Sequence, residues 1–224
     1  MYHHDMGYQR RERSVIPYIA LAALVLLAAF FVYKGGRRRA VSGIGEPVQT
    51  EEKGHIDRTM DGWKLSIDYD YAYDIEALVI HTKDYPETSL GGKLAPRDLA
   101  LAWGSVAAYN EVIDFHWRQS NRWYYWSASS YEEIAPVALK GIDATTSVSL
   151  QSSNNHIVPA DSSVKRTIKK IRRGDHVHLK GYLVNINGST ADGKIYYWNS
   201  STTRADTGGG SCEVFYVTSA EILP

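Results

Sequence analysis

Residues 63–75, with the sequence WKLSIDYDYAYDI, alternate between large apolar side chains and polar or small ones. The large members are Trp63, Leu65, Ile67, Tyr69, Tyr71, Tyr73 and Ile75. A period of two over this length predicts a β-strand with one face packed on a core and the other face in water. Residues 77–80 (ALVI) follow as a second apolar stretch. A sheet is therefore expected to form the basis of the fold.

Further short runs predict more strands and a few helices. Strands are expected at 175–184, 195–198 and 214–217, and a hairpin is expected from the aromatic runs 112–117 and 122–126. Turns are expected at Asn187-Gly188 and Asp192-Gly193. Helices are expected at 96–103, 131–135 and 161–171, the last capped by Asp161 or Ser162 and ended by Gly174. The predicted class is α+β, with a mainly antiparallel β domain (a small barrel or curled sheet, possibly OB-like) and two or three short helices.

Residues 15–33 form a run of 19 residues without a charge. As a helix the run spans roughly 28 Å, which is close to the hydrocarbon thickness of a bilayer. KGGRRR follows directly, so an uncleaved transmembrane helix is favoured over a signal peptide. The expected anchor residues are Val15, Pro17, Tyr18, Leu24, Leu27, Phe30, Phe31 and Tyr33.

The chain is thereby divided into four parts. Residues 1–14 form a polar basic tail, 15–33 the membrane helix, 34–60 a Gly-rich linker and 61–224 the globular domain. Three basic residues precede the span and four follow it, which leaves the orientation open. The abundance of Tyr, Trp, Asn and Ser favours a periplasmic domain on a bacterial inner membrane.

Charge and cysteine content exclude several classes. The whole chain has 25 basic and 25 acidic residues, but from Ala40 onward 18 basic residues are outnumbered by 23 acidic ones. Binding of nucleic acid through phosphates needs a basic excess, so no nucleic-acid partner is expected. Cys212 is the only cysteine, which excludes a disulfide scaffold, a Cys-X-X-Cys-His haem site and a four-cysteine cluster. No cofactor is expected.

Three stretches carry a resemblance to a known group of proteins. They are residues 153–160 (SNNHIVPA), 174–184 (GDHVHLKGYLV) and 204–213 (RADTGGGSCE). In these stretches the chain resembles a family of uncharacterised bacterial single-span envelope proteins with a short N-terminal anchor. The resemblance implies an anchored envelope protein and no particular activity.

Histidines and the cysteine are the candidates for chemistry. His176 and His178 flank one residue on a predicted strand and so share a face, where they could supply two metal ligands with His156 or Asp206 as a third. Two solvent-facing polar residues are the simpler interpretation, and no metal site is predicted. Cys212 could act as a nucleophile with His156 as its base, but a buried free thiol is the commoner outcome. No catalytic residue is assigned.

The glycine run and the basic helix have structural interpretations too. Gly208–Gly210 lack the strand–Gly–Lys–Ser/Thr–helix pattern of a phosphate loop and are expected to form a sharp turn. Six basic residues gather around the helix predicted at 161–171: Lys165, Arg166, Lys169, Lys170, Arg172 and Arg173. They form either a solvated face or a surface for an acidic partner or anionic lipid.

Adjacent aromatic residues are the most unusual feature of the domain. The side chains of adjacent residues on a strand point to opposite faces of the sheet. Neighbouring rings therefore cannot all pack into one core on one face. Exposed Trp and Tyr are typical of protein interfaces and of sugar-binding surfaces. A sheet packed on both faces, with a helix over the second face, would account for the rings equally well. The candidate partner contacts are Trp117, Trp123, Tyr125, Trp126, Tyr197, Trp198, Lys169 and Arg173.

These observations favour a non-catalytic, membrane-anchored accessory subunit that binds and stabilises a larger bacterial membrane complex, such as a photosynthetic, respiratory or secretion assembly. Its partners would be integral membrane subunits and the lipid bilayer. Two alternatives stay open: an envelope hydrolase that uses Cys212 or a His-based metal site, and a cell-wall or glycan-binding module.

Overall fold

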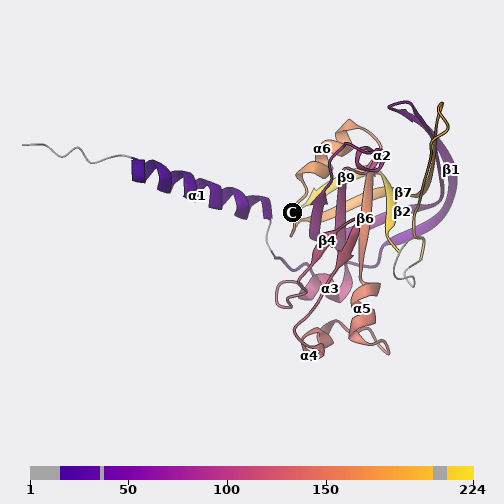
Figure 1. Ribbon diagram of the computed structural model, residues 1–224. Coiled ribbons are helices and arrows are strands. Elements are labelled where there is room, and N and C mark those ends of the chain that lie inside the picture. The colour runs from indigo at the N-terminus through magenta and orange to yellow at the C-terminus, as the bar shows by residue number, and fades with distance from the viewer. Residues whose placement is uncertain (1–15, 36–37, 204–210) are drawn as a thin grey trace, which may run out of the picture. The chain divides into compact units, whose positions relative to one another are not determined.

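The computed structural model describes residues 16–35, 38–203 and 211–224. The chain divides into two compact units, Met1–Gly35 and Gly36–Pro224. The first unit holds helix α1 (Ile16–Gly35), and the second holds the strands and the other described helices. The second unit is mostly β-sheet with a few short helices (Figure 1).

Seven strands form one sheet in the order β1-β2-β3-β6-β9-β7-β8. Their bounds are β1 (Val48–Met60), β2 (Trp63–Asp84), β3 (Arg97–Ala102), β6 (Ser152–Pro159), β7 (His176–Thr190), β8 (Ile195–Asn199) and β9 (Glu213–Leu223). Neighbours are antiparallel except β6 and β9, which are parallel. Strand β2 also pairs with β7, so the sheet curls until β2, β3, β6, β9 and β7 form a closed ring. A separate hairpin consists of β4 (Arg118–Ser120) and β5 (Trp123–Tyr125).

The alternation predicted for residues 63–75 is present in β2. Leu65 and Ile67 are buried in one apolar cluster, and Tyr73 and Ile75 are buried in a second. Between them the pairing with β7 shifts between Tyr69 and Tyr71, which marks a bulge. The long strand therefore contributes to two parts of the core.

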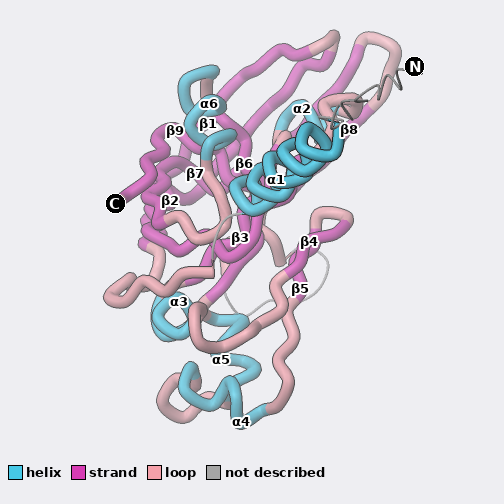
Figure 2. The backbone as a smooth tube through the Cα atoms, turned by 90° about the vertical axis from the view of Figure 1, so that its left-hand side faces the viewer, coloured by secondary structure: helices cyan, strands magenta, loops and turns pink. Residues whose placement is uncertain are grey.

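The helices gather at two ends of the sheet. Helices α2 (Leu90–Leu94) and α6 (Ser162–Lys170) lie at one end. At the other end lie α3 (Gly104–Tyr109), α4 (Tyr131–Ile134) with the short 3₁₀ helix Ala135–Val137, and α5 (Ala144–Leu150) (Figures 1 and 2). The predicted cap of α6 is confirmed, because the Asp161 carboxylate accepts hydrogen bonds from the N–H groups of Ser163 and Val164.

Arg97 donates hydrogen bonds to the carbonyl groups at the C-terminal end of α6. Its guanidinium donates to the carbonyls of Ile168, Lys169 and Ile171 at 3.1, 3.1 and 2.7 Å, and it pairs with Asp84 at 2.6 Å. The last carbonyls of a helix have no partner within the helix, and a cation there also complements the helix dipole. Strand β3 thus holds α6 in place.

The prediction of a transmembrane helix is contradicted. Helix α1 forms over the apolar run, but no helix within the described residues is both long and apolar enough to cross a membrane. The single-pass description that rested on this helix is corrected accordingly.

Four of the eight predicted anchor residues have described side chains. Pro17, Tyr18, Leu24 and Leu27 are exposed on α1. Val15, the side chains of Phe30, Phe31 and Tyr33, and the tail predicted at 1–14 lie outside the described residues.

The structure differs from the sequence predictions at four further places. The hairpin expected from runs 112–117 and 122–126 forms from β4 and β5 instead, and residues 112–117 are not a strand. The segment 34–60, expected as a linker, contains β1, which forms a hairpin with β2 through Asp61 and Gly62 in the left-handed region (φ 48° and 81°). The helix expected at 96–103 is wrong, because β3 lies there between β2 and β6 with both faces buried. Asn187-Gly188 does not form a turn, since both residues are paired within β7.

Gly181 lies where the pairing of β7 with β9 shifts register. A Cβ atom at this position would lie 1.9 Å from the carbonyl oxygen of Tyr216, so the strands would have to move apart. We expect Gly181→Ala to lower the free energy of unfolding by about 1–3 kcal/mol, measured by chemical denaturation. In Gly45→Ala the added Cβ meets nothing within 4 Å, and we expect a change within about 0.5 kcal/mol. Equal losses in the two variants would contradict the steric explanation.

Candidate functional site

The β4–β5 hairpin separates its side chains onto two faces. Its outer face carries Arg118, Trp123 and Tyr125, all exposed. Arg118 is paired with Tyr125 across the hairpin, and its guanidinium carbon lies 5.3 Å from the centre of the Tyr125 ring. Trp123 and Tyr125 are 40% and 39% exposed. The outer face therefore presents two large rings and a cation to solvent; we call it the hairpin face.

The inner rings of the same segment are packed together. Trp117 is only 6% exposed, and its ring centre lies 4.9 Å from that of Phe115 and 6.5 Å from that of Trp126. The indole N–H of Trp117 donates to Asn110 at 2.8 Å. The hydroxyl of Tyr124 lies 3.2 Å from that of Ser152 on β6. The expectation of rings on both faces fits this arrangement, with the inner rings belonging to the core.

Arg122, at the turn of the hairpin, fixes it to the sheet. Its backbone is left-handed (φ 69°), as is that of Asn121 (φ 50°). The guanidinium donates to Asp98 on β3 at 2.6 Å and to the carbonyl of Gly91 at 3.1 Å. It also covers the ring of Tyr85, with its central carbon 3.6 Å from the ring centre. Burial, followed by the charge of Asp98, raises the pKa of Tyr85 to about 12.

A second polar chain reaches the hairpin from β2. The imidazole Nδ1 of His81 donates to Gln119 at 2.9 Å, and the amide of Gln119 donates to Asn154 on β6 at 2.5 Å. Asn154 in turn donates to the carbonyl of Arg122 at 2.9 Å. Burial lowers the pKa of His81, and the hydrogen bond to Gln119 opposes this only in part. A neutral His81 thus completes an uncharged network under the hairpin.

His156 and Cys212 lie in the same cluster. Nδ1 of His156 is 3.0 Å from Asp98 but is not oriented for a hydrogen bond, and its ring lies 4.9 Å from that of Trp198. The sulfur of Cys212 lies 3.5 Å from the Asn154 amide nitrogen and 3.7 Å from the carbonyl of Arg122. A nucleophilic pairing of Cys212 with His156 was only an alternative to the predicted non-catalytic role, and it stays an open alternative. Arg204, Asp206 and Gly208–Gly210 lie outside the described residues.

His176 and His178 each contact a carboxylate of β2. The Nε2 atoms lie 2.8 Å from Glu76 and 2.5 Å from Asp74 respectively, and Lys180 shares Asp74 at 2.9 Å. Over the part of the chain that the structure describes, no group of three or more His, Cys, Asp or Glu residues is placed to hold a metal ion.

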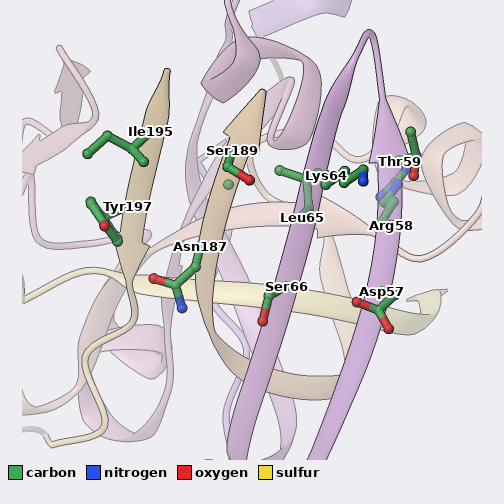
Figure 3. Close-up of a pocket in the computed structure, with 11 residues that line it drawn as sticks. Asp57, Arg58, Thr59, Lys64, Leu65, Ser66, Asn187, Ser189, Ile195 and Tyr197 are labelled. Atoms are coloured by element: carbon green, nitrogen blue, oxygen red, sulfur yellow. The ribbon is translucent and has the colours of Figure 1, made fainter. Parts of the chain in front are cut away.

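A groove lies on a second surface, the polar face of β1, β2, β7 and β8 (Figure 3). Its volume is about 550 Å³. Strand pairing sets its side chains in two rows across the four strands. One row is Asp57, Ser66, Asn187 and Tyr197, and the other is Thr59, Lys64, Ser189 and Ile195. Tyr197 and Ile195 are 66% and 67% exposed. We call this feature the sheet groove.

The remaining predicted contact residues have other surroundings. Trp198 points to the apolar side of β8, where its ring lies 5.4 Å from the Arg122 guanidinium. Lys165 and Lys169 lie 2.8 and 3.7 Å from Glu87, so the basic face of α6 is partly neutralised. Arg173 is half-buried, and burial followed by the charge of Arg38 lowers its pKa.

Comparison of the chain with protein-family models, with curated proteins and with solved structures gives no match in any of the three. The resemblance to bacterial envelope proteins therefore stays a prediction.

The Arg122–Asp98 pair should dominate the stability of the hairpin. Arg122→Met leaves the Asp98 carboxylate, which is 0% exposed, without its cation. We expect the free energy of unfolding to fall by about 3–5 kcal/mol, measured in urea. The double variant Arg122→Met/Asp98→Asn removes the buried charge and should recover part of this loss. A double variant as unstable as the sum of the two single variants would contradict the pairing.

His55, beside the sheet groove, should titrate above its ordinary pKa of 6.5. Its hydrogen bond with Asp68 at 2.7 Å is the largest cause, followed by that with Asp57. The same contact lowers the pKa of Asp68. The pair therefore stabilises the fold between the lowered pKa of Asp68 and the raised pKa of His55. This stabilisation is lost as the pH rises through the latter or falls through the former.

Asp68→Asn tests this assignment by NMR titration of the histidine rings. The pKa of His55 is expected to fall toward its ordinary value because its main acceptor loses its charge. The pKa of His81, which burial lowers, is the control and should not move. An unchanged His55 titration would show that Asp68 is not its partner.

Proposed function

We propose that the β-rich unit is a protein-binding domain, an accessory component of a larger assembly, and that the hairpin face is its contact surface. The observation that supports this most is the exposure of Trp123 and Tyr125 beside Arg118. Trp, Tyr and Arg are the residue types that contribute most to binding energy at protein interfaces.

The support beneath the hairpin face strengthens the proposal. Two rings that stay exposed on a short two-stranded hairpin would be mobile without an anchor, since such hairpins are marginally stable alone. Here Arg122, Gln119 and Tyr124 tie the hairpin to three strands of the sheet. A surface that is already ordered loses less entropy when it binds. The membrane complex expected from the sequence as the partner stays a prediction.

Site-specific photo-crosslinking in the native host tests the proposal. A benzophenone amino acid at position 123 or 125 is expected to give the same discrete protein adduct, whose partner is then identified by mass spectrometry. The matched control is position 131, because Tyr131 is an aromatic residue that is 54% exposed on α4. Adducts from position 131 with none from 123 or 125 would overturn the assignment of the hairpin face.

Affinity measurements with the identified partner complete the test. We expect Trp123→Ala and Tyr125→Ala each to weaken binding by about tenfold or more, since central aromatic contacts contribute 1–2 kcal/mol or more on an order-of-magnitude scale. Tyr131→Ala should bind like the parent. Unchanged affinity in both hairpin variants would contradict the proposal.

A further inference from the structure

The sheet groove has a chemistry different from that of the hairpin face. Its floor lies on β2 and β7 and consists of small polar side chains: Ser66, Asn187 and Ser189. Tyr197 and Ile195 on β8 form one side, and Asp57 and Thr59 on β1 form the other (Figure 3). A ligand in this groove would meet hydroxyl and amide groups beneath it and a ring at its edge.

Main-chain recognition is not available in the groove. Strands β2 and β7 each have a hydrogen-bonded neighbour on both sides along the groove, so their N–H and C=O groups are used in the sheet. An extended peptide gains affinity mainly by pairing its main chain with a free strand edge. The face of a sheet offers side chains only, and a ligand must therefore carry its own dense set of donors and acceptors.

Several polar groups in the groove are available to such a ligand. The hydroxyls of Thr59, Ser189 and Tyr197 and the ammonium of Lys64 make no hydrogen bond or ion pair with any residue in the described ranges. Asp57, one of whose oxygens lies 3.1 Å from His55, adds a carboxylate. The groove thus offers both donors and acceptors over about 550 Å³, a volume typical of small-ligand sites.

The charged side chains of the groove indicate whether its polar ligand is a phosphate-rich or a neutral one. Lys64 and Asp57 have opposite signs, and the guanidinium of Arg58 is directed to the carbonyl of Pro159 at 3.4 Å. A phosphate-rich ligand would need several cations, and of the two basic residues that line the groove Arg58 is directed to Pro159. The exposed ring of Tyr197 can pack against the apolar C–H face of a sugar ring while hydroxyl groups reach the floor. We propose that the sheet groove binds a neutral oligosaccharide, with Tyr197 as the stacking ring.

The test is NMR titration of the isotope-labelled full chain with three trisaccharides: chitotriose, cellotriose and maltotriose, each at millimolar concentration. We expect at least one of them to shift amide signals of β2, β7 and β8 around the groove. Tyr197→Ala is expected to weaken this binding by about fivefold or more, and Tyr197→Phe, which keeps the ring, should retain most of it. Amide spectra of the variants check that the fold is intact.

Three outcomes would overturn the proposal: no groove shifts with any trisaccharide, shifts confined to another surface, or equal binding by the parent and Tyr197→Ala. Trp123→Ala is the matched control, because it removes an exposed ring from the hairpin face and should leave sugar binding unchanged. The converse holds for the protein partner, whose binding should survive Tyr197→Ala. Failure of one proposal is thereby distinguishable from failure of the other.

Discussion

The contact between Arg122 and Asp98 is the constraint on which the rest of the β-rich unit depends most. A fully buried carboxylate is stable only with a cation and hydrogen bonds nearby, and Arg122 supplies both from a left-handed turn. The turn is tied to Asp98 on β3 and to Asn154 on β6, and the Arg122 guanidinium also covers the ring of Tyr85. This ion pair, together with the contacts of Gln119 and Tyr124, holds the hairpin that presents Trp123 and Tyr125.

The sheet groove depends on a different constraint, the length of β2 and β7. Both strands extend beyond the closed ring, with β1 and β8 added at their sides. On this extension Leu65 and Ile186 face the apolar cluster while Ser66 and Asn187 face the groove. Since the side-chain period of a strand is two, the packing that buries one row necessarily exposes the other. The packing of the core therefore fixes the positions of the polar side chains in the groove.

The sequence predicted those features that local periodicity controls. The alternation of β2, the cap of α6 and the turn at Gly193 depend on neighbours in the chain and were predictable. Strand β3 was not, because Pro96 and a following run of Leu and Ala are equally compatible with a helix, and only burial between β2 and β6 decides. The transmembrane helix was wrong as well, because no helix within the described residues is both long and apolar enough to cross a membrane.

The candidate surfaces required knowledge of pairing across the sheet. Asp98 and Arg122 are separated by 24 residues, and nothing in either neighbourhood shows that they meet. Asp57, Ser66, Asn187 and Tyr197 come from four strands, and a shift of one residue in any register would place them on opposite faces. Exposed rings could be anticipated from adjacent aromatics, but which rings stay exposed depends on those same pairings. Which side chains share a surface is therefore determined by the pairing of strands that are distant in the sequence. Whether a segment forms a strand is determined by its local sequence.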